Sequence, residues 1–141
     1  MSPVRRTKHA VYDTRYHFVW IPKYRKHLFA KEISNYSKEI FQRIAKEYEF
    51  EIDTMEVMEN HVHLFLSAPP RYSPARIVQV LKSISSRQVF RRFPHLKEIL
   101  WKMELWSDRY FVRTVGDRVT AEVIERYIKY QHQEEQLDFG F

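Results

Sequence analysis

Hydrophobic and polar positions follow two different periods along this chain, and the changes of period mark predicted strands and helices. Residues 11–21 are rich in β-branched and aromatic side chains with partial alternation, which predicts a strand. Residues 31–48 carry apolar side chains at helical spacing with Glu and Lys between them, which predicts an amphipathic helix. Residues 50–58 alternate apolar and acidic side chains, a pattern typical of a half-buried strand.

The same alternation of strand and helix continues in the second part of the chain. Residues 59–60, Glu-Asn, are a tight-turn signal before a predicted strand at residues 61–66, so this strand is expected to form a hairpin with the preceding one. Ser73 is a residue type that caps helices, and Pro74 opens a helix that ends at Pro94.

Residues 100–103 and 110–115 are strand-like, and a last helix is expected from about residue 119 to residue 136. The complete order is β-α-β-β-α-β followed by an additional C-terminal helix, which is the ferredoxin-like split βαβ arrangement. We therefore expect an α+β fold with an antiparallel sheet that has helices on one face. The strands at 11–21 and 61–66 are expected at its centre.

No repeat, low-complexity tract or change of composition divides the chain, so we expect a single domain over residues 1–141. Residues 1–10 are polar and basic and are expected to form a flexible arm, while residues 117–141 hold the last helix and its tail. No apolar run approaches the roughly 20 residues of a membrane span, and no apolar segment follows the basic N-terminus. We therefore expect a cytoplasmic protein without a membrane partner.

The composition indicates a partner and excludes some chemistry. Lys and Arg number 24 against 18 Asp and Glu, a net charge of +6, and aromatic residues make up 16% of the chain. Cations and rings in this proportion favour a nucleic-acid partner, although a basic protein with an aromatic core has the same composition. The chain has two glycines and no cysteine, which excludes Gly-rich phosphate loops, thiolate metal sites and cysteine nucleophiles. We therefore expect no nucleotide cofactor.

The tripeptide His61-Val62-His63 is the first candidate for chemistry. Side chains alternate along a strand, so both imidazoles leave one face about 6.6 Å apart. That separation suits two ligands of one metal ion. Two ordinary half-buried histidines would produce the same pattern.

The last predicted helix supplies the second candidate. Tyr127 and Gln131 are four residues apart and project from the same helix face. A tyrosine hydroxyl is a possible nucleophile, and a glutamine carbonyl is an oxygen ligand. Tyr130 also lies near this face, so spacing alone does not choose between the two tyrosines, and both could be core residues of an amphipathic helix.

Taken together and in order, these motifs resemble the single-tyrosine HUH transposases (TnpA-like) of the insertion-sequence 200/605 family, in which HUH denotes His-hydrophobe-His. The resemblance covers nearly the whole chain. Ile21 replaces a frequent cysteine of the family without chemical consequence. Ser83 stands where many members have glycine, which bears on DNA contact. The hinge before the last helix has one glycine, Gly116, which bears on the mobility of that helix. The matching stretches are residues 20–25, 60–64, 69–70, 85–87, 93–94, 105–107, 110–116 and 127–131.

The resemblance implies that Tyr127 is the catalytic nucleophile and that His61, His63 and Gln131 bind a divalent metal ion, magnesium or manganese. It implies a DNA transposase that recognises DNA hairpins and cleaves and rejoins single-stranded DNA at transposon ends through a 5′-phosphotyrosine intermediate. It also implies a homodimer in which the tyrosine helix of one subunit acts on the His pair of the other.

This chemistry is consistent with the residues. A metal ion can act as a Lewis acid on the scissile phosphate, and a tyrosine with an unperturbed pKa near 10 needs such help. A phosphotyrosine ester retains the bond energy, so rejoining needs no ATP. Glu122, Glu125 and a metal-bound water are unranked candidates for the general base.

Cationic side chains are expected to contact the DNA, although any of them could instead be solvated. The basic loop after Pro22 favours phosphate contact in particular. The candidates are Lys23, Arg25, Lys26, Lys82, Arg87, Arg91, Arg92, Arg109 and Arg113.

Three other readings remain open at this point. A domesticated relative that processes genomic hairpins would have the same chemistry, so the sequence does not distinguish it from a transposase. A non-catalytic RNA- or DNA-binding ferredoxin-like module would need no His pair, and the aromatic pattern of RNA-recognition strands is absent. A metal-dependent hydrolase that uses only His61 and His63 would retain activity in Tyr127→Phe.

Overall fold

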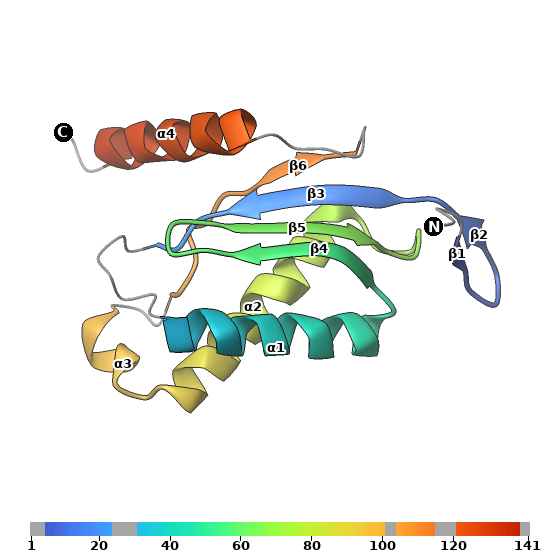
Figure 1. The fold of residues 1–141 in the computed structure, drawn as a ribbon, viewed down its shortest axis with the longest axis horizontal. Coiled ribbons are helices and arrows are strands. Elements are labelled where there is room, and N and C mark those ends of the chain that lie inside the picture. The colour runs from blue at the N-terminus through green and yellow to red at the C-terminus, as the bar shows by residue number, and fades with distance from the viewer. Residues whose placement is uncertain (1–4, 24–30, 101–103, 115–120, 139–141) are drawn as a thin grey trace.

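The computed structural model describes residues 5–23, 31–100, 104–114 and 121–138. Four strands form an antiparallel sheet in the spatial order β4-β5-β3-β6 (Figure 1). The central pair, β5 and β3, is the pair that the sequence pattern predicts. These strands are β3 (Arg15–Trp20), β4 (Glu51–Val57), β5 (Val62–Ser67) and β6 (Phe111–Arg113).

Helices cover both faces of this sheet (Figure 1). Helices α1 (Lys31–Tyr48) and α2 (Pro74–Arg92) lie on one face, and α4 (Ala121–Asp138) lies on the other. The side chain of Ser73 accepts a hydrogen bond from the backbone N–H of Arg76, which confirms the predicted cap of α2. The fold is the expected ferredoxin-like α+β arrangement with an additional C-terminal helix.

The main hydrophobic core lies between the sheet and the α1–α2 layer. Strands β3 and β5 contribute alternate residues to it, among them Trp20, Val62 and Leu64, which are fully buried. The residues between them point to the opposite face, where α4 lies. Side chains that alternate along β3 and β5 therefore give the sheet one face that packs in the main core and another that can hold polar residues beneath α4.

Helix α4 rests on a much smaller apolar cluster than α1 and α2 do. Its Ile124 and Ile128 pack against Val19 and Ile21 of the sheet. No other fully buried apolar residue belongs to this cluster among the described residues. Little burial holds α4 in place, so its docking is expected to be less stable than the main core.

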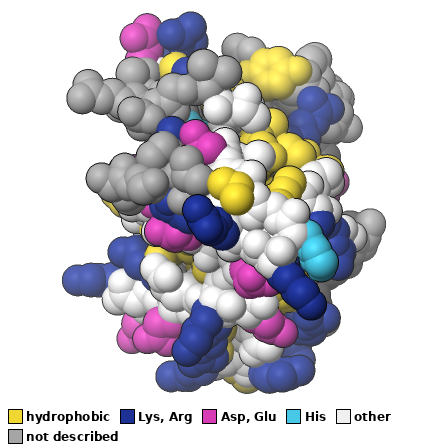
Figure 2. Space-filling view, turned by 90° about the vertical axis from the view of Figure 1, so that its right-hand side faces the viewer, with side chains coloured by type: hydrophobic (Ala, Val, Ile, Leu, Met, Phe, Trp, Pro, Cys, Tyr) yellow, Lys and Arg dark blue, Asp and Glu magenta, His cyan; other side chains and the backbone are white. Residues whose placement is uncertain are grey.

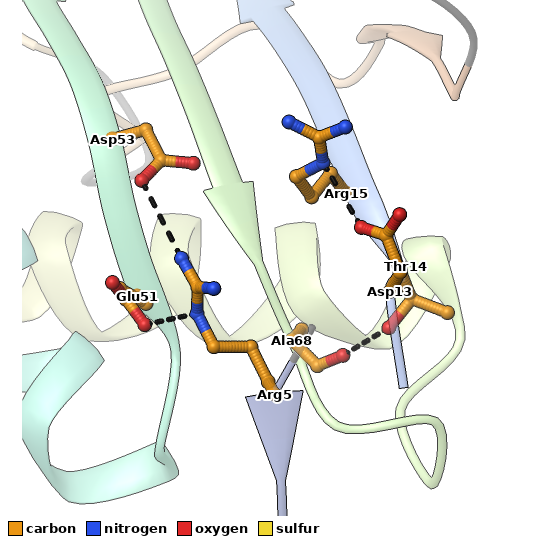
Figure 3. A network of polar contacts seen from close by, with 7 residues as sticks. All are labelled: Arg5, Asp13, Thr14, Arg15, Glu51, Asp53 and Ala68. Carbon is orange, nitrogen blue, oxygen red and sulfur yellow. Dashed lines mark hydrogen bonds and ion pairs between the residues drawn. The ribbon is translucent and has the colours of Figure 1, made fainter. Parts of the chain in front are cut away.

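An N-terminal hairpin, β1 (Arg5–Arg6) paired with β2 (Val11–Tyr12), occupies part of the region expected to be a flexible arm. Arg5 forms ion pairs with Glu51 and Asp53 of β4 (Figure 3). Two-residue strands have no detectable hydrophobic period, and the partners of Arg5 are distant in sequence. The sequence pattern therefore could not predict this hairpin.

The single strand predicted at 11–21 is interrupted after Tyr12. The side chain of Thr14 donates a hydrogen bond to the carbonyl of Ala68 (Figure 3). Asp13 accepts a hydrogen bond from the Nε of Arg15 at 3.1 Å. The side chains of Asp13 and Thr14 thus make hydrogen bonds in the break between β2 and β3.

The region predicted as a strand at 100–103 differs as well. Leu100 follows a short helix, α3 (Leu96–Ile99), and residues 101–103 lie outside the described part of the chain. The predicted strand at 110–115 is shorter, since β6 spans only residues 111–113, and Val115 and Gly116 are also outside the described residues.

Among the helices that the structure describes, none is long and apolar enough to cross a membrane.

Candidate active site

The sheet face beneath α4 carries a row of side chains contributed by four strands. The register sets Glu56 of β4 opposite His63 of β5. Val19 of β3 is the other neighbour of His63, and Phe111 of β6 pairs with Val19. Paired positions project from the same face of a sheet. His61 lies two positions before His63 and shares this face, as the alternation predicts.

The two histidines converge on one carboxylate. His61 Nε2 and His63 Nδ1 each lie 4.0 Å from Glu56 Oε2. The cavity around them also reaches α4, so the helix covers the His pair directly. Its lining residues are Glu56, Asn60, His61, His63, Ile124, Glu125 and Ile128.

The second ring nitrogen of each histidine has a polar neighbour. His61 Nδ1 is 2.8 Å from Asn60 Oδ1, and an amide oxygen can only accept, so His61 Nδ1–H donates this bond. The lone pair of His61 is therefore on Nε2, which faces the cavity. His63 Nε2 is 3.1 Å from Nδ1 of His17 on β3. The sequence did not single out these partners as site residues. Strand pairing brings His17 and Glu56 to the His pair, whereas Asn60 precedes His61 directly in the chain.

The environment keeps both imidazoles neutral. Burial lowers the pKa of His61 below its ordinary value, and the nearby carboxylate of Glu56 only partly opposes this. Burial also lowers the pKa of His63, where Glu56 opposes the effect and His17 and His61 add to it. Neutral imidazole is the form that binds metal ions, so the electrostatics suit a ligand role.

Gln131 of α4 is almost fully buried, with 4% of its surface exposed. Its Nε2 donates a hydrogen bond to Ser107 Oγ at 3.2 Å. This bond orients the amide and leaves Oε1 as the acceptor atom. Ser107 is thus a positioning partner that the sequence alone did not reveal.

The three residues expected to bind metal share one property. His61 Nε2, His63 Nδ1 and Gln131 Oε1 are buried and have no hydrogen-bond partner among the described residues. A buried polar atom without a partner is costly unless a ligand satisfies it. No group of three or more His, Cys, Asp or Glu side chains in the described ranges is arranged to hold a metal ion. The Gln131 amide lines a different cavity from the His pair, so the three atoms do not share one cavity in this structure.

The two tyrosines of α4 have different environments. Tyr127 is half-buried, with its ring centroid 6.1 Å from that of Phe111, whereas Tyr130 is 52% exposed. Tyr127 therefore packs against the apolar cluster on the sheet, whereas Tyr130 is more exposed but borders the same two cavities as Tyr127. Tyr127 and Gln131 line a cavity next to β6 that is separate from the His cavity. The structure thus brings together His61 with His63, and Tyr127 with Gln131, but not all four in one cavity.

Lys82 is engaged inside the protein rather than solvated. Its Nζ donates hydrogen bonds to the carbonyls of Ser107 at 2.6 Å and Arg109 at 2.9 Å. The ammonium also lies between the rings of Trp20 and Tyr110, at 6.0 and 5.9 Å from their centroids. Burial lowers the pKa of Lys82 to about 8, against a smaller opposing effect of Asp108. In this structure, the residue ties α2 to the segment before β6.

The other cations expected to contact DNA are distributed over both sides of the sheet. Arg109 and Arg113 border the cavities next to α4, whereas Lys23 forms an ion pair with Glu104. Arg25 and Lys26 lie outside the described residues. On the face shown in Figure 2, Lys and Arg lie among Asp and Glu and form no continuous basic stripe. The candidates on α2, Arg87, Arg91 and Arg92, are exposed.

Comparison with known proteins identifies the family of this chain. Residues 10–131 match the family model described as "Transposase IS200 like". The ISDra2 transposase TnpA of Deinococcus radiodurans is 41% identical over 125 residues, which cover 89% of this chain and 89% of that protein. The transposase for insertion sequence element IS200 of Salmonella typhimurium is 31% identical over 137 residues, 97% of this chain and 89% of that protein. The chain belongs to the IS200-like transposase family, and the resemblance inferred from its motifs is confirmed.

Solved structures agree with the family assignment. A crystal structure from Deinococcus radiodurans R1, described as a transposase, has a TM-score of 0.78 and 36% sequence identity, covering 90% of this chain and 97% of that chain. A REP-associated tyrosine transposase bound to a REP hairpin has a TM-score of 0.53 at 14% identity, covering 92% of this chain and 70% of that chain. The second similarity concerns the fold alone. The protein is thus a transposase, an enzyme that acts on DNA.

The position of Lys82 predicts a pH dependence of stability. Its pKa is about 8 in the folded protein against an ordinary value of 10.5, so between these pH values the unfolded chain binds more protons. The free energy of unfolding should therefore rise across this window, by about 1–2 kcal/mol after allowance for partial exposure. Urea unfolding of wild type and Lys82→Met at several pH values measures the difference.

The matched control is Lys97→Met, which alters an exposed lysine on α3. Its pH profile should run parallel to that of the wild type, whereas Lys82→Met should lose the rise. Parallel profiles for wild type and Lys82→Met would contradict the role assigned to burial of Lys82.

Proposed function

We propose that this transposase cleaves and rejoins single-stranded DNA with Tyr127 as the nucleophile and a divalent metal ion held by His61, His63 and Gln131. The observation that carries the proposal is the matched set of buried, unpartnered ligand atoms on these three residues. Two imidazole ligands favour manganese or a softer ion, whereas magnesium prefers oxygen ligands. The family resemblance implies magnesium or manganese. When bound, the ion would supply Lewis-acid polarisation of the scissile phosphate.

The covalent step exchanges one phosphodiester for another. The Tyr127 oxygen attacks phosphorus, the bond from phosphorus to the 3′ oxygen breaks, and the released 3′ oxygen takes up a proton. The products are a 5′-phosphotyrosine and a free 3′-OH. In rejoining, a 3′-OH attacks the phosphotyrosine and Tyr127 leaves, so no external energy source is required.

The proposal requires α4 to change its position relative to the His pair. In this structure Ile124 and Ile128 line the His cavity, whereas Tyr127 and Gln131 line another one, so both the nucleophile and the third ligand must approach the His pair. The small apolar cluster beneath α4 supports such a movement, because few buried side chains must separate. We propose that α4 either shifts over its own sheet or docks on the partner subunit of a homodimer.

We also propose that the substrate carries a hairpin and that the reaction takes place in the cytoplasm. The structural neighbour with a REP hairpin supports hairpin recognition, since its fold is similar to this one. Arg109 and Arg113 border the Tyr127 cavities and are the described cations best located to contact a strand there. Loss of one true phosphate contact should reduce the salt slope of DNA binding by about one.

A covalent-adduct assay tests the nucleophile. Wild-type protein is mixed with a single-stranded hairpin from the flanks of its own gene and with Mn²⁺ or Mg²⁺, and the products are separated on a denaturing gel. Tyr127→Phe should form no adduct because it lacks the attacking oxygen. Tyr130→Phe is the matched control on the same helix, and it should form the adduct because the proposal assigns the attacking oxygen to Tyr127 alone.

Cleavage by Tyr127→Phe would instead favour a hydrolase that uses the His pair alone. Hairpin binding without an adduct in the wild type would favour a non-catalytic binding module. A domesticated relative would pass the assay, but its gene would lack the repeated copies between subterminal palindromes that mark a mobile element.

Removal of the metal tests the other half of the proposal. Chelation with EDTA should abolish the adduct, and addition of Mn²⁺ or Mg²⁺ should restore it. His61→Ala should reduce adduct formation by at least about tenfold at limiting metal, since one of three ligands is lost. Undiminished activity of the chelated enzyme would rule out a metal-dependent mechanism.

A further inference from the structure

His17 lies in the sheet face beneath α4, between Phe65 of β5 and Arg113 of β6 in the strand register. It lies in the central strand β3 and only 2% of its surface is exposed. A buried imidazole is costly unless its polar atoms are hydrogen-bonded. His17, buried beneath the His pair, therefore needs a hydrogen-bond partner for its ring nitrogens.

The ring of His17 is held between two neighbours on β5. It stacks on Phe65 with centroids 4.1 Å apart and 10° between the planes. It also stacks on His63, with centroids 5.3 Å apart and 26° between the planes. His17 Nδ1 lies 3.1 Å from His63 Nε2, so the stacking fixes the ring where it can share one hydrogen bond with His63.

The direction of that hydrogen bond decides which atom of His63 can bind a metal ion. If His63 Nε2 accepts, the proton of a neutral His63 is on Nδ1, which then has no lone pair for a metal. That Nδ1–H would also be a buried donor without a hydrogen-bond partner among the described residues. If His63 Nε2–H donates, Nδ1 keeps its lone pair and faces the cavity.

We propose that His17 is a positioning residue, whose Nδ1 accepts a hydrogen bond from His63 Nε2–H and thereby directs the lone pair of His63 Nδ1 into the cavity shared with His61. This inference rests on the proposed metal site. The hydrogen bond between His61 and Asn60 is parallel: Asn60 Oδ1 accepts from His61 Nδ1–H and leaves the lone pair of Nε2 for the metal ion. Metal-binding histidines generally donate their other N–H to such an acceptor.

One consequence is specific to this geometry. The two histidines of the HUH tripeptide bind the ion through different ring nitrogens, His61 through Nε2 and His63 through Nδ1. Both atoms lie 4.0 Å from the same oxygen of Glu56, so they face a common point.

Two substitutions of similar polarity test the role of His17. In His17→Asn, the side-chain oxygen can occupy the former position of Nδ1 and accept from His63. In His17→Gln, the amide lies near the former Nε2 position, and the acceptor next to His63 is lost. Titration calorimetry of the metal-free protein with Mn²⁺ should show that His17→Gln binds about 10- to 100-fold more weakly, while His17→Asn recovers most of the affinity.

Phe65→Leu is the packing control. It removes the aromatic ring stacked on His17 but keeps the His17–His63 hydrogen-bonding atoms, so its Mn²⁺ affinity should remain closer to wild type than that of His17→Gln. Equal affinities for wild type and His17→Gln would overturn the inference, as would an equal loss in the Asn and Gln variants.

Nitrogen NMR of the imidazoles in the metal-free protein gives a second readout that is independent of activity. Wild type should show His63 with its proton on Nε2, and His17→Gln should lose this preference. A proton on Nδ1 of wild-type His63 would overturn the inference even if a variant failed to fold.

The same measurements separate this inference from the proposed function. Wild-type protein that binds Mn²⁺ and loses it in His61→Ala supports the metal site itself. If that holds and His17→Gln binds normally, only the role of His17 fails. If wild type binds no Mn²⁺ yet forms the Tyr127 adduct, the metal site and the role of His17 fail together while the nucleophile stands.

Discussion

The alternation of side chains along β5 is the constraint on which the active-site geometry depends, because this central strand has no exposed residue. Val62 and Leu64 point into the main core, and His63 and Phe65 point to the α4 face. A slip of one residue in the pairing with β3 would move His63 into the hydrophobic core and Leu64 to the site. The burial that stabilises one face of the strand therefore fixes the orientation of the ligands on the other.

Burial also sets the chemistry of that second face. It lowers the pKa of His61 and His63 and so keeps both in the ligand form. It makes unpartnered polar atoms costly, so each imidazole is held at its other nitrogen by Asn60 or His17. The ligand atoms that remain without a partner are those that a metal ion would satisfy.

The segment before β6 joins the layers on opposite faces of the sheet. Lys82 of α2 binds the carbonyl of Ser107, whose hydroxyl in turn accepts a hydrogen bond from Gln131 of α4. Trp106 donates its indole N–H to Ser85 at 2.8 Å, which ties the same segment to α2. Helix α4 thus combines a small apolar contact with the sheet and a hydrogen bond from Gln131 to the segment before β6.

The sequence by itself determined the order of strands and helices, the shared face of His61 and His63, and the family. These features depend on local periodicity and on short motifs, which a single chain displays directly. Only the tertiary structure decided that Tyr127 packs against the apolar cluster on the sheet, that Lys82 is bound to carbonyls, and that His17 lies against His63. The tertiary structure also set the N-terminal hairpin and the separation of the Tyr127 and His cavities. Each of these depends on strand register or on contacts between residues far apart in the chain, which local patterns do not encode.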